Sequence, residues 1–319
     1  MERTHQYNGA VTSDRTFVSA LATGISFVDL NFLDRPHAIA AATVEAAGRV
    51  AIVDPGPSTC LATLERSLQA RGIRLTDVEH ILLTHVHLDH AGATGTVLRA
   101  HPHVRVLVHE RGAPHLVDPS RLVASASRLW PNDMERLWGE VLPVPAAQID
   151  VLRGGERIDA GGRTFDVAYT PGHASHHVSY FDAASGIAFV GDTAGMSVDG
   201  GYVLAPTPPP DIDLALWRQS VSRIETWSPD MLFLTHFGPV GTPRAHLGTL
   251  LDHLETMAAL VRDSLRAPES DQERSQRFAE DLRRELRRHM TEGQVAAYEL
   301  SAPFHLLWLG LARYWRKRD

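Results

Sequence analysis

The feature that most constrains this chain is the run THVHLDHAG at residues 84–92, which follows a short apolar Ile-Leu-Leu stretch. The apolar stretch is typical of a buried strand. Side chains two residues apart in extended backbone point the same way, so we expect His85, His87 and Asp89 to converge while His90 faces another side. This density of imidazole and carboxylate groups suits two adjacent metal ions. A polar loop with chance histidines is the alternative, because the chain contains 18 of them.

Further motifs accompany this run in a fixed order. Upstream lies AIVDPG at 51–56, and downstream lie YTPGH at 169–173, FVGDT at 189–193 and LFLTHFGP at 232–239. The three downstream motifs each end an apolar, strand-like run, where a loop can present a ligand. Together the five motifs resemble those of the metallo-β-lactamase superfamily, and the resemblance covers about residues 24–240.

The resemblance implies seven metal ligands, divided over two sites that share one bridging aspartate. His85, His87 and His173 would hold the first metal ion, Asp89, His90 and His236 the second, and Asp192 would bridge both. Zinc suits this mixture of imidazole and carboxylate, so we expect two Zn²⁺ ions, with Mn²⁺ or Fe²⁺ as substitutes. Two such ions polarise a shared water, and the resulting hydroxide is the expected nucleophile.

Other residues near the motifs receive separate interpretations. Asp89 and Asp192 are expected to orient the metal-bound hydroxide, and Asp54 to orient a ligand histidine. The alternative for Asp54 is an ordinary turn aspartate that precedes a proline. His176 and His177 are interpreted as strand-start or pocket residues, because the ligand set is complete without them. Four more histidines are interpreted as structural or surface groups: His101, His103, His109 and His115.

The order of apolar and helical patterns predicts an α/β fold. Strands are expected at 25–33, 38–45, 49–53, 80–84, 104–108, 163–169, 177–182, 186–190 and 231–234, and helices at 58–70, 93–100 and 211–227. Because the ligands come from two halves of this alternating pattern, we predict a four-layer αββα sandwich. The fold of the superfamily is of this kind. Residues 1–242 are expected to form this catalytic domain.

Two segments lie outside the sandwich. Residues 110–142 read as a helical insert with several aromatic residues, and both a cap over the metal site and a packed surface subdomain remain open. Residues 243–319 are expected to form a helical extension, with helices at 243–265, 271–290 and 302–316. The last of these carries an apolar stripe that is typical of a core, although it could equally close a homodimer: Phe304, Leu307, Trp308, Leu311 and Trp315.

Composition restricts the partners and the compartment. A net charge of −7 argues against a large nucleic-acid surface, and no apolar run reaches the length of a bilayer span. Residues 1–6 lack the pattern of an export signal, and Cys60 is the only cysteine, which excludes an intramolecular disulfide. We therefore expect a cytoplasmic protein whose partner is a small-molecule substrate, with no nucleic acid and no membrane.

The ligand pattern favours the glyoxalase II-like and lactonase-like branch. Asp192 occupies a bridging position where one lactamase class has cysteine and another has serine, and His87 stands where the flavodiiron branch has glutamate. We predict a zinc-dependent metallo-hydrolase that cleaves a small ester, thioester or lactone. The helical extension resembles glyoxalase II in its placement. However, Lys317 is the only lysine, whereas those enzymes use lysines to hold glutathione.

Three alternatives stay open. A phosphodiesterase or ribonuclease of the same fold would need a basic groove, for which the arginine-rich extension is the candidate. Hydrolysis of a β-lactam is considered as a minor activity. A non-catalytic binding protein on the same fold would normally lack a ligand, and none is missing here.

Overall fold

The computed structural model describes residues 18–318. The first 17 residues and Asp319 lie outside this range. The prediction that residues 1–6 carry no export signal therefore concerns residues that the structure does not describe. Within the described range, none of the helices combines the length and apolar character needed to cross a membrane.

Two β-sheets form the centre of the molecule. The first sheet has the order β1 (Val18–Ala22), β2 (Ile25–Asp29), β3 (Ala40–Ala46), β4 (Arg49–Val53), β5 (Val78–Leu82), β6 (Arg105–His109) and β7 (Ile149–Leu152). The second has the order β13 (Gly238–Val240), β12 (Met231–Leu234), β11 (Ile187–Phe189), β10 (Val178–Asp182), β9 (Arg163–Tyr169) and β8 (Arg157–Ala160). Pairing is parallel from β4 to β7 and between β11 and β12, and antiparallel elsewhere.

The two sheets pack face to face through an apolar layer. The second sheet contributes the aromatic rings of Phe165, Tyr180, Phe189 and Phe233, and the first sheet contributes mainly small and aliphatic side chains. Phe189 and Phe233 lie with ring centroids 5.8 Å apart. Because large rings on one sheet face small residues on the other, the two layers can approach closely.

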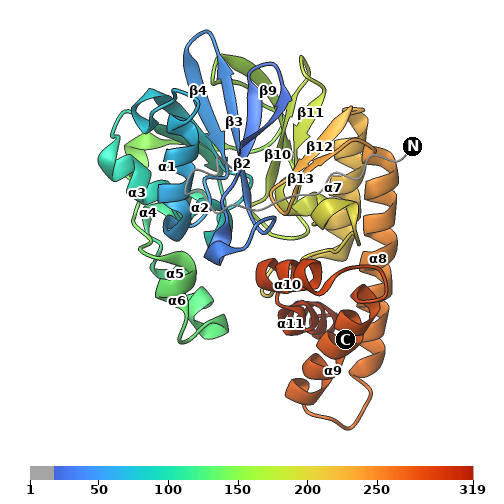
Figure 1. Cartoon of the computed structure of the whole chain (residues 1–319). Coiled ribbons are helices and arrows are strands. Elements are labelled where there is room, and N and C mark those ends of the chain that lie inside the picture. The colour runs from blue at the N-terminus through green and yellow to red at the C-terminus, as the bar shows by residue number, and fades with distance from the viewer. Residues whose placement is uncertain (1–17, 319) are drawn as a thin grey trace, which may run out of the picture.

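Helices cover the outer face of each sheet (Figure 1). On the first sheet lie α1 (Leu61–Gln69), α2 (Leu88–Ala91) and α3 (Thr94–Ala100), and on the second lie α7 (Leu214–Thr226) and α8 (Pro243–Ser264). Short 3₁₀ turns occur at Phe32–Asp34, Ser58–Cys60, Leu75–Asp77, Ala146–Gln148, Gly191–Ala194 and Val198–Gly200. The order helix, sheet, sheet, helix confirms the predicted αββα sandwich.

The insert and the extension lie at the same end of the sandwich (Figure 1). The insert contains α4 (Ala113–Val117), α5 (Ser120–Leu129) and α6 (Met134–Trp138), and the extension continues from α8 with α9 (Asp271–Leu286), α10 (Glu292–Ser301) and α11 (Phe304–Arg316). On α11, Phe304, Trp308 and Leu311 are fully buried in the core that also contains residues of β12. The apolar stripe thus packs within the chain itself, as its interpretation as core predicts.

The structure corrects several element boundaries. The strand expected at 25–33 ends at Asp29, because Asn31, Leu33 and Asp34 adopt left-handed backbone conformations. The strand expected at 80–84 is β5, Val78–Leu82. The helix expected at 271–290 ends at Leu286, and a separate helix follows, which begins at the capping box of Thr291 and Gln294. Four short strands were not predicted: β1, β7, β8 and β13.

The long helix α8 allows a test of how much the extension stabilises the sandwich. Leu250 is fully buried in the shared core, whereas Leu260 is 59% exposed on the same helix. We expect Leu250→Ala to lower the free energy of unfolding by about 2–5 kcal/mol. Leu260→Ala should change it by no more than about 0.5 kcal/mol. Denaturant unfolding of both variants measures this difference, and equal effects would contradict the shared core.

Cys60 provides a second test of packing. Its side chain is buried, and burial raises the pKa of the thiol to about 12. Because the thiolate is the reactive form, we expect no reaction with an aromatic disulfide reagent in the folded protein at mildly alkaline pH. One equivalent should react after unfolding in guanidinium chloride. Rapid reaction of the folded protein would show that this segment opens readily.

Candidate metal centre

Seven side chains from both halves of the sandwich meet at one edge. His85 and His87 lie in the loop after β5, Asp89 and His90 on α2, His173 after β9, Asp192 in the 3₁₀ turn after β11, and His236 after β12. Each segment follows a central strand, so the sheets deliver the ligand loops to the same end. The structure therefore brings together all seven residues that the resemblance implies. Their role as metal ligands stays a prediction.

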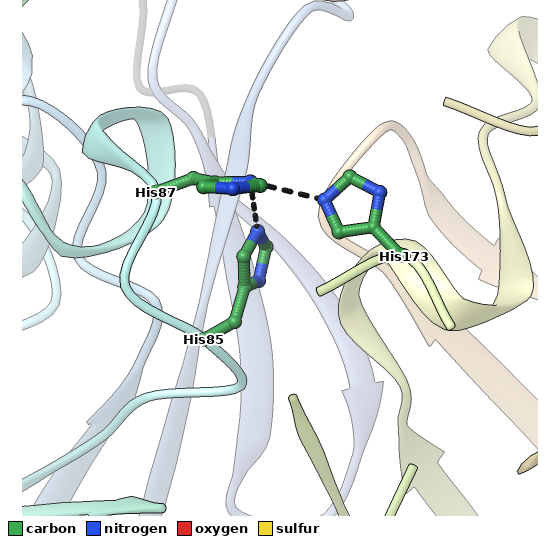
Figure 2. A group of neighbouring side chains, drawn as sticks. All are labelled: His85, His87 and His173. Atoms are coloured by element: carbon green, nitrogen blue, oxygen red, sulfur yellow. Dashed lines mark hydrogen bonds between the residues drawn. The ribbon is translucent and has the colours of Figure 1, made fainter. Parts of the chain in front are cut away.

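Three histidines form the first group, and Figure 2 shows their rings pointing toward one another. Nε2 of His85 lies 2.9 Å from Nδ1 of His87, and Nε2 of His173 lies 3.0 Å from the same Nδ1. His85 and His173 are buried, and His87 is partly exposed. Three ring nitrogens that converge in this way leave room for one shared cation.

Asp89, His90 and His236 form the second group. An oxygen of Asp89 lies 3.3 Å from Nε2 of His236 and 3.7 Å from Nε2 of His90. Both rings are buried, whereas the Asp89 side chain is 18% exposed. This group is the second ligand set that the resemblance implies.

Asp192 connects the two groups. Its Oδ2 lies 3.3 Å from Nε2 of His173 in the first group. Its Oδ1 lies 3.2 Å from Nε2 of His90 and 3.6 Å from Nε2 of His236 in the second. One carboxylate oxygen thus faces each group, which is the arrangement required of a bridging ligand.

One expectation about this site is wrong. Extended backbone was expected to place Asp89 beside His85 and His87, with His90 on another side. The chain instead turns at His87, the N-cap of α2, so Asp89 and His90 lie on a helix. Asp89 therefore groups with His90 and His236 rather than with the two earlier histidines.

Backbone carbonyls orient two of the ligand histidines. Nδ1 of His173 donates to the Pro206 carbonyl at 2.8 Å, and Nδ1 of His236 donates to the Ala38 carbonyl at 2.6 Å. In the neutral ring, these bonds place the proton on Nδ1 and leave Nε2, which faces the centre, with a free lone pair. The Ala38 carbonyl also accepts from Oγ of Ser301 at 3.0 Å, so the extension contacts the support of His236.

Asp54 is the central polar support of the site. Its carboxylate accepts from the Thr84 backbone N–H at 2.8 Å, from the Thr84 hydroxyl at 2.7 Å and from the Thr235 hydroxyl at 3.0 Å. It also lies 2.8 Å from Nδ1 of His90. Asp54 is 1% exposed and has a φ of 52°, a conformation that costs energy in a residue other than glycine. These contacts fit the predicted orienting role better than an ordinary turn.

Burial and mutual charge determine the protonation of the site. Burial, together with neighbouring histidines, lowers the pKa of His85 well below its usual value and that of His87 to about 4. Burial opposes the ionisation of Asp89, but His90 and His236 outweigh it and lower its pKa to about 2. Burial would lower the pKa of His90, but facing carboxylates raise it well above normal. The pKa of His236 is raised for the same reason. His85 and His87 are thus neutral donors, while the ionised carboxylates attract positive charge to the second group.

Unsatisfied polar atoms support the same conclusion. Among the buried side-chain atoms without a hydrogen-bond partner in the described residues are Nε2 of His90, Nε2 of His236 and Oδ1 of Asp192. All three face the centre of the second group. Because an unpaired buried polar atom is costly, the donor set fits divalent metal ions of the zinc type.

Two glycines allow the ligand loops to approach other segments. A side chain at Gly172, whose φ is 142°, would lie 2.4 Å from the backbone of Trp217 on α7. A side chain at Gly191, whose φ is 43°, would lie 2.6 Å from the Thr84 hydroxyl. Each glycine directly precedes a ligand residue, so close packing fixes the positions of His173 and Asp192.

The family model of the metallo-beta-lactamase superfamily matches residues 35–236, which include all seven of these side chains. The chain belongs to the metallo-β-lactamase superfamily. A curated relative, the metallo-beta-lactamase fold-containing protein ST1585 of Sulfurisphaera tokodaii, is 31% identical over 170 residues, covering 52% of this chain and 63% of that protein. A hydroxyacylglutathione hydrolase of Fuscovulum blasticum is 31% identical over 187 residues, covering 59% of this chain and 56% of that protein.

Solved structures give the same fold. The structure of ST1585 has a TM-score of 0.60 at 25% identity and covers 73% of this chain and 86% of its own. The metallo-beta-lactamase family protein TTHA1429 of Thermus thermophilus has a TM-score of 0.67 at 23% identity, and the match covers 88% of this chain and 89% of that chain. The chain spans less than two thirds of the length of both curated relatives named above.

A cavity of about 390 Å³ adjoins this metallo-β-lactamase-type centre. His87, Asp89, His173 and Asp192 line its inner end. His176 also lines it, as the pocket interpretation predicts, whereas His177 is buried beside Thr170 and Thr193. His115, which is interpreted as a structural or surface group, is partly exposed and lines the cavity as well. No sequence signal distinguished His115, because its approach to the ligands depends on how the insert folds back.

The support by Asp54 leads to a prediction about metal affinity. We expect Asp54→Asn to weaken metal binding by about 10–100-fold, because the amide cannot accept from all of its present donors. Competition with a coloured chelator measures this affinity. Asp159→Asn, at an exposed position of β8, is the matched control and should bind metal normally. An unchanged metal affinity of the Asp54→Asn variant would refute the orienting role of Asp54.

Proposed function

We propose that this protein is a dinuclear zinc-dependent hydrolase that cleaves a small ester, thioester or lactone. The observation that carries the proposal is the position of Asp192, whose Oδ2 lies beside His173 of the first group and whose Oδ1 lies beside His90 and His236 of the second. When bound, two zinc ions supply an activated water nucleophile and polarise a carbonyl group. Mn²⁺ or Fe²⁺ are the alternatives with similar ligand preferences.

The chain's own residues would then hold and orient these groups. His87 and Asp89 are partly exposed and line the cavity, so a substrate reaches the centre from that side. Asp89 and Asp192 present carboxylate oxygens toward the reacting region and can accept a proton from an incoming water. Asp54 keeps His90 in one orientation through the bond to Nδ1. Positioning of this kind reduces the reorganisation needed during reaction.

Two observations favour carbonyl substrates. Several curated relatives carry the name hydroxyacylglutathione hydrolase, which supports a thioester as one candidate. The residues that line the cavity are mostly apolar, which supports a small organic substrate rather than a nucleic acid. The cytoplasmic location and the small-molecule partner are part of this proposal.

Substitution of the bridge tests the proposal. We expect Asp192→Asn and His87→Ala each to lower turnover by about 100-fold or more, because each removes a metal ligand. Initial rates on a glutathione thioester and on a simple lactone measure turnover, and elemental analysis measures the metal content. His103→Ala, at an exposed position, is the control and should retain both turnover and metal content.

The outcomes separate the parts of the proposal. Two zinc ions per chain with hydrolysis of either substrate would support it. Full turnover in a folded Asp192→Asn protein would refute the assignment of the bridge. A chain that binds no metal and hydrolyses neither compound would refute the enzyme function.

A further inference from the structure

The cavity beside the metal centre extends far beyond the ligands. Its inner end is formed by metal ligands, and its outer part lies between α5 and α6 of the insert and α10 and α11 of the extension. These two pairs of helices lie at the same end of the sandwich (Figure 1). The outer part of the cavity is therefore formed largely by the two segments that the metal motifs do not include.

Both outer walls carry apolar side chains beside a few charged and polar ones. The insert contributes Leu122, Ala126, Leu129 and Trp130, and the extension contributes Leu306 and Leu307. The loop that connects to α7 adds Pro208, Pro209 and Pro210. Leucine, tryptophan and proline surfaces gain free energy by contact with hydrocarbon rather than with a charged group.

Packing of aromatic rings makes the insert wall rigid. The rings of Trp130 and Trp138 lie edge to face, with centroids 5.3 Å apart. Trp138 also stacks on Phe32, with centroids 5.8 Å apart, and is 6% exposed. The cavity is therefore held open by packed side chains and does not depend on a flexible loop.

Most of the charged groups around the cavity already have partners. Arg136 pairs with Asp133 at 2.9 Å, and Glu299 pairs with Arg283. Asp211 accepts from the Ser175 hydroxyl at 2.6 Å. Among the lining arginines of the described chain, Arg121 alone makes no ion pair. A ligand with several anionic groups would therefore meet few free cations here.

We infer that this cavity binds a hydrocarbon chain or aryl group that the substrate carries on one side of its scissile acyl bond. The inference rests on the proposed function, because the metal ligands place the reacting carbonyl at the inner end. It names the substrate class as an ester, thioester or lactone with an extended apolar group. The apolar group would contact both the insert and the extension, so these two segments would determine specificity.

Two substrate series test this inference on the zinc-loaded protein. In p-nitrophenyl esters from acetate to decanoate, the acyl chain grows while the leaving group stays constant. In alkyl acetates from methyl to decyl, the alcohol chain grows instead. We expect kcat/KM to rise about two- to fourfold per methylene in at least one series until the cavity is filled. The series that rises identifies which side of the carbonyl enters the cavity.

A matched pair of variants localises the effect. Ala126 is 8% exposed and lines the cavity, whereas Ala124 is exposed on the same helix and does not line it. We expect Ala126→Trp to lower the ratio of kcat/KM for the longest and shortest chains by about tenfold or more. Ala124→Trp should leave this ratio unchanged. Leu129→Glu, which places a charge in the wall, is the second variant if Ala126→Trp does not fold.

A binding measurement separates this inference from the proposed function. Tryptophan fluorescence, with Trp130 in the cavity wall, reports binding of 1-decanol and 1-hexanol, which carry no charge that attracts a metal ion. We expect decanol to bind more tightly than hexanol, and Ala126→Trp to abolish the difference. This result without any hydrolysis would support the cavity and refute the function. Hydrolysis without chain-length dependence, equal in both tryptophan variants, would overturn the inference.

Discussion

The hydrogen-bonded, buried carboxylate of Asp54 is the interaction on which the rest of the candidate metal centre depends. It joins the end of β4 to Thr84 and His90 in the first half and to Thr235 in the second. A buried charge is costly unless it is fully hydrogen-bonded, so these segments must remain in place together. The same contacts fix the orientation of His90 and hold the end of the first sheet against the end of the second.

The helical extension is also a structural part of the centre. Helices α8 and α11 share a core with β12, and Ser301 on α10 donates to the Ala38 carbonyl that orients His236. The Thr207 hydroxyl, next to the carbonyl that orients His173, donates to the Leu307 carbonyl on α11. The segment that lines the outer cavity thus also supports His173 and His236, which links the cavity wall to the geometry of the candidate metal site.

Local sequence patterns predicted most of the central strands and the helices on them, because each is specified by its own apolar periodicity. The patterns failed where a segment's structure depends on contacts with another segment of the chain. β1 and β8 are strands mainly because they pair with β2 and β9. Asp89 and His90 lie on a helical turn, and this turn places both side chains beside His236 of the second sheet. Extended spacing could not reveal this turn.

The sequence alone predicted the seven candidate ligand residues and the layer order, since motifs and apolar periodicity are local properties. Only the tertiary structure brings these side chains into contact, because Asp192 and His236 reach the histidine-rich loop from the second sheet. It also decided that His115 and the insert face α11 across a cavity. Contacts between segments far apart along the chain arise from packing of the whole core, which no single segment encodes.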